Sequence, residues 1–163
     1  MRESDTANLN VPSAEAMREL GRDLGRALAR HRGNAVVVAI QGELGAGKTT
    51  FVGGVLNALG IAGPARSPTY TLVEPYDVAD RQVFHLDLYR LADPREVDAL
   101  GVRDLLSVDS VLLIEWPERG EGMIPPADLD LSIGYCGDDQ REITLHARGA
   151  VGRELLRQLP VVR

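Results

Sequence analysis

The stretch Gly42-Glu43-Leu44-Gly45-Ala46-Gly47-Lys48-Thr49 matches the pattern G-x-x-x-x-G-K-[ST], in which a glycine-rich loop wraps around phosphate groups. Lys48 is the only lysine in the chain, and seventeen arginines carry the rest of the positive charge. Lysine is a compact point charge on a thin stem, whereas the guanidinium of arginine is a wide planar fork. The two are not interchangeable in a loop that closes around a polyphosphate. The stretch therefore predicts a nucleoside triphosphate site.

The residues on either side of this loop predict a strand before it and a helix after it. Residues 35–40 form an uninterrupted apolar run rich in β-branched side chains, which is typical of a parallel strand buried on both faces. Apolar residues recur at helical spacing in residues 50–59, and Gly60 stands where a helix end favours positive φ. In this order of elements the loop amides point at the β-phosphate. Lys48 reaches the β- and γ-oxygens, and the Thr49 hydroxyl ligates Mg²⁺.

Length and composition agree with a single P-loop domain over residues 1–163. The chain is 44% apolar, but no continuous apolar run approaches the 18 residues of a membrane span, and its first residues form no signal-peptide core. We therefore expect a cytoplasmic protein with no membrane partner. The net charge is −6, and the arginines between Arg18 and Arg32 are scattered along one predicted helix. Tight autonomous binding to nucleic acid is disfavoured because counterion release needs clustered cations.

The rest of the chain predicts an α/β fold with a mixed, mostly parallel central sheet flanked by helices and carrying antiparallel hairpins. Residues 1–12 are polar and are expected to be flexible, and Ser13 is expected to cap a helix that ends near residue 33. The remaining helices are expected to begin at 93–96 and to cover 151–159. Strands are expected at 69–73, with Pro75 placing this strand at a sheet edge or near a bulge, at 82–88 and 111–114, and in a hairpin of 129–135 with 143–147.

Two expected strands end in a carboxylate, and P-loop enzymes place the acid on the magnesium side at such a position. Glu115 ends the cleaner apolar run and is favoured for the metal, although a Walker B strand usually ends in aspartate. Asp87 ends a more polar run and is the better candidate to position or deprotonate the attacking water. The alternative for Asp87 is a salt bridge to Arg90 or a cap.

Three further features each allow two interpretations. His85, between apolar neighbours, is expected to be a sheet histidine with satisfied hydrogen bonds rather than a ligand or a catalytic group. Trp116, the sole tryptophan, either packs in the core or covers the nucleotide. Residues 67–71 form either a loop that senses the γ-phosphate or a simple proline turn.

Four motifs in register resemble the TsaE (YjeE) family of small bacterial P-loop ATPases: GELGAGKTTF at 42–51, SPTYTLVEPY at 67–76, HLDLYRL at 85–91 and LLIEWPE at 112–118. The resemblance covers roughly residues 13–147. It implies an ATPase required for the threonylcarbamoyladenosine modification of tRNA, acting with the TsaB and TsaD proteins and meeting tRNA only indirectly. By motif, it implies that Thr49 and Glu115 ligate Mg²⁺, and that Asp87 and Trp116 belong to the active centre. The residues that it implies for ATP binding are Gly42, Glu43, Leu44, Gly45, Ala46, Gly47, Lys48, Thr49 and Thr50.

The expected reaction is phosphoryl transfer from ATP to water, in which Lys48 and Mg²⁺ offset charge and Asp87 acts on the water. Hydrolysis by the chain alone should be slow, with Arg66 and Arg90 the candidates for a stabilising cation. A P-loop small-molecule kinase is the alternative, but residues 115–127 contain one arginine and give little support to an arginine-rich lid. A GTP-dependent switch is excluded because its N/T-K-x-D motif needs a second lysine.

Overall fold

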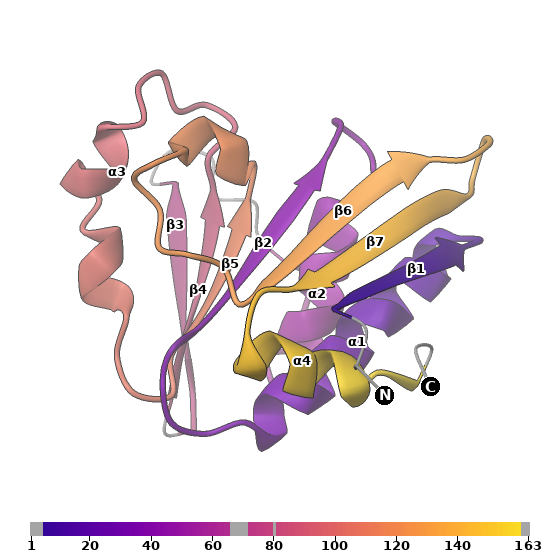
Figure 1. The fold of residues 1–163 in the computed structure, drawn as a ribbon, viewed down its shortest axis with the longest axis horizontal. Helices are drawn as coiled ribbons and strands as arrows, with labels where there is room; N and C mark the ends of the chain where they lie inside the picture. Colours follow the sequence, from indigo (N-terminus) through magenta and orange to yellow (C-terminus); the bar gives the residue numbers. More distant parts are fainter. Residues whose placement is uncertain (1–4, 66–71, 80, 161–163) are drawn as a thin grey trace.

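A seven-stranded sheet in the order β1-β7-β6-β2-β5-β4-β3 runs through the molecule (Figure 1). The computed structural model describes residues 5–65, 72–79 and 81–160. The central strands, which are parallel, are β6 (Leu129–Tyr135), β2 (Val36–Gly42), β5 (Val111–Glu115) and β4 (Arg81–Asp87). The strands that pair antiparallel at the two sides are β7 (Arg141–Ala147), β1 (Thr6–Val11) and β3 (Val73–Val78). This arrangement confirms the predicted α/β fold with a parallel centre and antiparallel hairpins.

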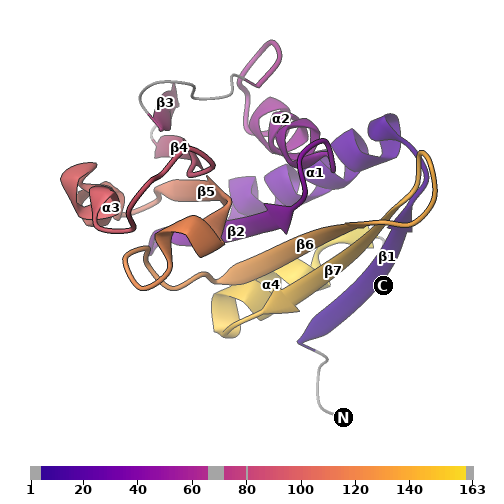
Figure 2. The same cartoon turned by 90° about the horizontal axis from the view of Figure 1, so that it is seen from above.

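Both faces of the central strands are covered. Helices α1 (Ala14–Arg30), α2 (Lys48–Ala58) and α4 (Ala150–Arg157) contribute to one apolar core, in which Val36, Val38 and Ile40 of β2 are buried. Val37 belongs to a second core on the other face, under α3 (Glu96–Ala99) and the 3₁₀ turns η1 (Val102–Leu105) and η2 (Pro117–Gly120). Figure 2 shows α1 and α2 side by side along one face. The continuous apolar run of β2 is explained by this two-sided burial.

The expectation of a flexible segment over residues 1–12 is wrong for residues 6–11, while residues 1–4 lie outside the described residues. Thr6–Val11 forms the edge strand β1, paired with β7 in a register that runs from Thr6 opposite His146 to Val11 opposite Arg141. Every second residue of the strand packs towards the core, and Val11 is buried. The intervening residues are polar because one side of an edge strand faces solvent. A strand of this kind has too few apolar residues to be recognised without its partner.

Several predicted boundaries shift in the structure. Ser13 caps α1, with its Oγ accepting the Ala16 amide at 3.1 Å, but the helix ends at Arg30 rather than near residue 33. The predicted strand at 69–73 lies mostly outside the described residues, and β3 instead begins at Val73, at a sheet edge as Pro75 predicted. The helix expected from 93–96 is only four residues long, because Gly101 at φ 68 turns the chain away.

The surface of α1 carries ion pairs within the helix. The pairs are Glu15 with Arg18, Glu19 with Arg22, and Asp23 with Arg26. These arginines therefore form a solvated face rather than a free basic patch. Within the part of the chain that the structure describes, no helix has the length and apolarity needed to cross a membrane.

Helices α1 and α2 approach each other through glycines. A Cβ placed on Gly54 would lie 2.1 Å from the backbone oxygen of Arg18, and one on Gly21 would lie 2.2 Å from the backbone oxygen of Phe51. Backbone atoms cannot move aside as a side chain can. This contact fixes the start of α2, and with it the phosphate-binding loop, against α1.

We expect Gly54→Ala to lower the free energy of unfolding by about 3 kcal/mol, because the added methyl group overpacks a backbone contact. Gly53→Ala is the matched control, since its Cβ would lie 3.6 Å from Ala65 Cβ, an ordinary contact. The control should stabilise the protein by about 0.5–1 kcal/mol through better helix propensity. Urea unfolding of both variants measures the difference, and equal effects would show that the glycine contact is unimportant.

Candidate nucleotide-binding site

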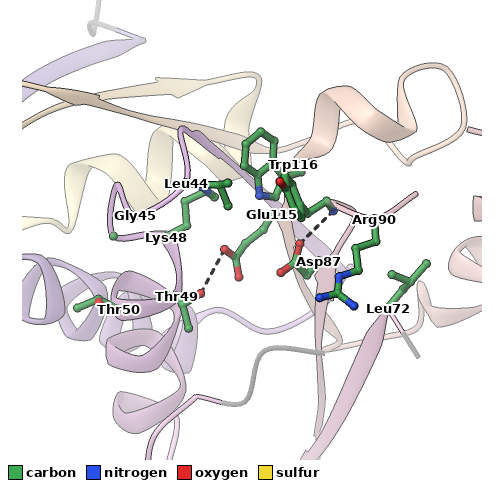
Figure 3. A pocket seen from close by; sticks show the side chains of 12 residues that line it. Leu44, Gly45, Lys48, Thr49, Thr50, Leu72, Asp87, Arg90, Glu115 and Trp116 are labelled. Atoms are coloured by element: carbon green, nitrogen blue, oxygen red, sulfur yellow. Dashed lines mark hydrogen bonds between the residues drawn. The ribbon is translucent and has the colours of Figure 1, made fainter. Parts of the chain in front are cut away.

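A pocket of about 360 Å³ opens at the carboxyl ends of the parallel strands, where the loop before α2 meets the ends of β4 and β5 (Figure 3). The register explains how two acids come together here, because Asp87 of β4 is the direct partner of Glu115 of β5. Glu115 in turn lies beside Ile40 of β2, just before the loop. The residues that line the pocket are Leu44, Gly45, Gly47, Lys48, Thr49, Thr50, Leu72, Asp87, Tyr89, Arg90, Glu115 and Trp116.

The loop has the conformation that its glycines predict. Gly45 and Gly47 adopt φ values of 77 and 115, which residues with a Cβ rarely adopt. The Ala46 amide donates to the Glu43 carbonyl at 3.0 Å, which closes a turn within the loop. Helix α2 begins at Lys48, and no side chain caps its first amides. These amides and the positive end of the helix dipole can therefore receive an anion.

Lys48 lies within the loop, and its side chain is only 5% exposed. Its Nζ donates to the carbonyl oxygens of Gly42 at 2.5 Å and of Glu43 at 2.9 Å, and lies 4.4 Å from the centre of the Trp116 ring. Burial lowers the pKa of the Lys48 amine, while the negative charges of Glu115 and Asp87 oppose this shift. An ammonium that has lost its water in this way gains most from a bound polyphosphate.

Glu115 is 2% exposed, and its two carboxylate oxygens meet different partners. Oε1 lies 3.5 Å from the Thr49 hydroxyl, and Oε2 lies 2.5 Å from Nε2 of His85. His85 is 0% exposed, and this contact is consistent with the prediction of a sheet histidine with satisfied hydrogen bonds. Its contact with Glu115 was not predicted, because the two residues are thirty positions apart in the sequence.

Asp87 is half-buried at the other side of the pocket, where its Oδ1 accepts the Tyr89 amide at 3.1 Å. This contact is the cap considered as an alternative role for Asp87. Among the described residues Arg90 makes no ion pair with Asp87, although both side chains line the pocket (Figure 3). Arg66 and residues 67–71 lie outside the described residues, so the predicted phosphate-sensing loop and the Arg66 cation have no structural account.

The side-chain oxygens of Thr49 and Glu115, which lie 3.5 Å apart, fit a magnesium ion that is shared with phosphates. Mg²⁺ prefers oxygen ligands and is commonly held by one or two carboxylates together with substrate phosphates. Over residues 5–65, 72–79 and 81–160, no cluster of three or more His, Cys, Asp or Glu could hold a metal without such help. The geometry therefore suits a metal that enters with a nucleotide.

Trp116 packs in part against the core, as one of its two interpretations expects, and its role towards a nucleotide stays a prediction. The residue is half-buried, and its ring packs against the second apolar core while also contacting the Lys48 amine. Tyr89 lies beside it, with ring centres 5.0 Å apart, and the Arg119 guanidinium lies 5.6 Å from the Trp116 ring. The backbone of Trp116 has φ 57, a conformation unusual for a bulky residue. With this backbone conformation directly after β5, the indole ring lies against the Lys48 amine of the loop.

Two residues that support the loop were not predicted. The Tyr135 hydroxyl donates to the Leu44 carbonyl at 2.7 Å, and Nε of Arg141 donates to the Ala46 carbonyl at 3.1 Å. The Arg141 guanidinium also lies 4.3 Å from the centre of the Tyr135 ring. Both residues come from the β6–β7 hairpin, more than ninety positions beyond the loop. No local sequence signal identifies such a contact.

A second pocket of about 300 Å³ lies on the other side of the loop, towards the start of α1 and the tip of this hairpin. Thr50, Gly45 and Gly47 line both pockets. The other residues that line the second pocket are Pro12, Ser13, Ala14, Met17, Ala46, Asp139 and Arg141. The loop therefore separates a pocket lined by two acids and two basic side chains from one lined by a single acid and a single arginine.

Comparison with known proteins identifies the family of this chain. The family model described as "Threonylcarbamoyl adenosine biosynthesis protein TsaE" matches residues 11–143. A tRNA threonylcarbamoyladenosine biosynthesis protein TsaE from Haemophilus influenzae is 43% identical over 90% of this chain and 92% of its own length. The protein of the same name from Bacillus subtilis is 39% identical over 69% of this chain and 70% of its own length.

The fold has a counterpart among solved structures. The crystal structure of Bacillus subtilis YdiB superposes with a TM-score of 0.75 and 26% sequence identity, and the match covers 98% of this chain and 97% of that one. The matched segment of the family model contains the loop, both acids and Trp116, and it ends within β7 at residue 143, so that it includes Tyr135 and Arg141. The chain therefore belongs to the TsaE family of threonylcarbamoyl adenosine biosynthesis proteins.

Proposed function

We propose that this chain binds ATP with Mg²⁺ at the pocket beside Lys48 and hydrolyses it slowly, as part of the threonylcarbamoyladenosine modification of tRNA. The observation that carries the proposal is the convergence of four groups at the carboxyl ends of the parallel strands. These groups are the Lys48 amine, the Thr49 hydroxyl, and the carboxylates of Glu115 and Asp87. The curated relatives from Haemophilus influenzae and Bacillus subtilis are named for this modification.

Each group has a role in phosphoryl transfer that follows from its position. The loop amides and the uncapped start of α2 bind the β-phosphate, and Lys48 leaves its two carbonyl partners to contact the β- and γ-oxygens. Thr49 and Glu115 would hold Mg²⁺, which would supply positive charge opposite the transferring phosphoryl group. Asp87 lies across the pocket and orients or deprotonates the attacking water. Trp116 covers the amine and limits the access of bulk water.

The second pocket is the proposed place for the nucleoside. It shares Thr50 and the loop glycines with the first pocket, and Pro12 and Met17 supply apolar surface for a base. We expect bound ADP to slow amide hydrogen exchange in residues 12–17 and 139–141 as well as in the loop. Val78 and Gln82, at the end of the β3–β4 pair away from Asp87, provide an internal comparison, because neither residue lines a pocket described above. Unchanged exchange at both 12–17 and 139–141 would place the base elsewhere.

The proposed partner is a complex of the TsaB and TsaD proteins, with tRNA met only through it. A net charge of −6 and the internally paired arginines of α1 argue against direct binding of tRNA. The pocket is open, and its two cationic side chains are Lys48 and Arg90. A partner that closes the pocket and adds positive charge would accelerate phosphoryl transfer from ATP. The cycle of ATP binding and hydrolysis would then return the partner complex to its starting state.

The decisive experiment measures ATP turnover by the pure chain with Mg²⁺, with and without the TsaB–TsaD complex, together with ATP and GTP affinities. We expect tighter binding of ATP than of GTP, slow turnover alone and faster turnover with the complex. The Lys48→Arg protein prepared in parallel detects any contaminating ATPase. Tighter GTP binding would overturn the proposal, and the absence of stimulation would favour the small-molecule kinase alternative.

A further inference from the structure

His85 is a fully buried polar side chain that the proposed reaction does not use. It lies in β4, where its ring is 0% exposed between the apolar residues Phe84 and Leu86. Its Nε2 lies 2.5 Å from Oε2 of Glu115, and an ionised carboxylate can only accept in such a contact. We propose that His85 is a positioning residue, which holds one oxygen of Glu115 so that the other oxygen faces Thr49 and the metal.

The sheet register places the three side chains in the required order. Asp87 is paired with Glu115, and His85 lies two residues before Asp87, so that His85 and Asp87 project on the same side of β4. Glu115 therefore lies beside Asp87 at the pocket, with His85 deeper along the strands. This arrangement gives the two carboxylate oxygens of Glu115 different partners. Oε2 contacts His85, and Oε1 lies 3.5 Å from Thr49 Oγ1.

The contact has an energetic reason. A glutamate side chain has three rotatable bonds, and a carboxylate that is free to rotate would lose entropy each time it binds a metal. Holding Oε2 in place removes most of that cost before the metal arrives. Hydrogen-bonded partners of metal-ligating carboxylates typically change metal affinity by about 10- to 100-fold when they are removed. Strand β4 would thus have two roles, because His85 would position the metal ligand Glu115 and Asp87 would act on the attacking water.

A purely structural role, in which each residue only satisfies the other in the core, makes a different prediction. Removal of His85 would then lower stability and leave the affinity for metal unchanged. The inference rests on the proposed role of Glu115 in holding the metal, so the measurement must separate the two. Binding of Mn²⁺ to the complex of the protein with ADP, followed by electron paramagnetic resonance, reports on the metal without any turnover.

We expect His85→Leu to weaken Mn²⁺ binding by about 10- to 100-fold while leaving ADP binding in EDTA within about twofold of the parent chain. His85→Gln, whose amide nitrogen can occupy the place of Nε2, should restore most of the affinity. His146→Gln is the matched control, because this histidine lies in β7 against Thr6 of the edge strand β1, lines neither pocket and should have no effect. Urea unfolding of each variant separates a loss of stability from a loss of affinity.

Each result decides between the two roles. Equal Mn²⁺ affinity in His85→Leu and the parent chain would overturn the positioning role while leaving the proposed function intact. If the parent chain with ADP failed to bind Mn²⁺ at all, both the proposed function and this inference would fall. Should His85→Leu not fold, His85→Gln and His85→Asn decide the question, because asparagine is too short to reach Glu115. The inference then requires weaker metal binding in His85→Asn than in His85→Gln, and equal affinities would overturn it.

Discussion

Replacing Lys48 with arginine is expected to lower ATP turnover by about 100- to 1000-fold, the loss typical of removing one preorganised charge from a transition state. The replacement keeps a positive charge, so the expected loss comes from shape. The Lys48 amine lies between the carbonyl oxygens of Gly42 and Glu43, at 2.5 and 2.9 Å, and beneath the Trp116 ring at 4.4 Å. A planar guanidinium is too wide to pass from this space to the phosphate oxygens.

The fold should survive this change, because Lys48 contacts loop carbonyls and a ring at the pocket rather than the apolar cores. Circular dichroism and urea unfolding check this expectation, and steady-state phosphate release measures turnover. Arg119→Lys is a matched control, since it exchanges the same two residue types beside the same Trp116 ring but outside the loop. Hydrolysis at the parent rate in Lys48→Arg would contradict the assigned phosphate contact.

Removal of Glu115 and removal of Asp87 should each impair ATP turnover, but through different quantities. Glu115→Ala is expected to raise the Mg²⁺ concentration needed for half-maximal turnover by at least about tenfold, because Oε1 and the Thr49 hydroxyl would hold the same ion. Asp87→Ala should leave this requirement nearly unchanged and lower the maximal rate by about 100-fold or more, the range for loss of a group that moves a proton. Turnover measured over a Mg²⁺ series at saturating ATP gives both quantities.

Near-isosteric variants separate the effect of losing a carboxylate from the effect of losing side-chain packing. Glu115→Gln keeps the volume beside His85, and Asp87→Asn keeps an oxygen that can accept the Tyr89 amide. Each should show the same kind of defect as the alanine variant of its position. If Asp87→Ala changed the Mg²⁺ requirement more than Glu115→Ala, the roles of the two acids would have to be exchanged.

The central elements could be predicted because their signals are local. The apolar run of β2, the glycines of the loop and the helical spacing of α2 occur within about 25 consecutive residues, and each reports on the backbone that it forms. The alternating hairpin of β6 and β7 has the same property. Edge strands lack such a local signal. One face of β1 is exposed to solvent and half of its residues are polar, so that it is recognised as a strand only through its pairing with β7.

The amino-acid sequence by itself determined the strand, loop and helix that can receive a phosphate, and the presence of a carboxylate at the ends of two strands. Only the tertiary structure decided which groups meet there. Parallel pairing of β4 with β5 brings Asp87 beside Glu115 and His85 within reach of it, and the β6–β7 hairpin brings Tyr135 and Arg141 to the loop. The physical reason is that backbone conformation is set by neighbours in the chain. Contacts between residues thirty to ninety positions apart are set by strand order and register, which arise only when the whole sheet buries its apolar faces.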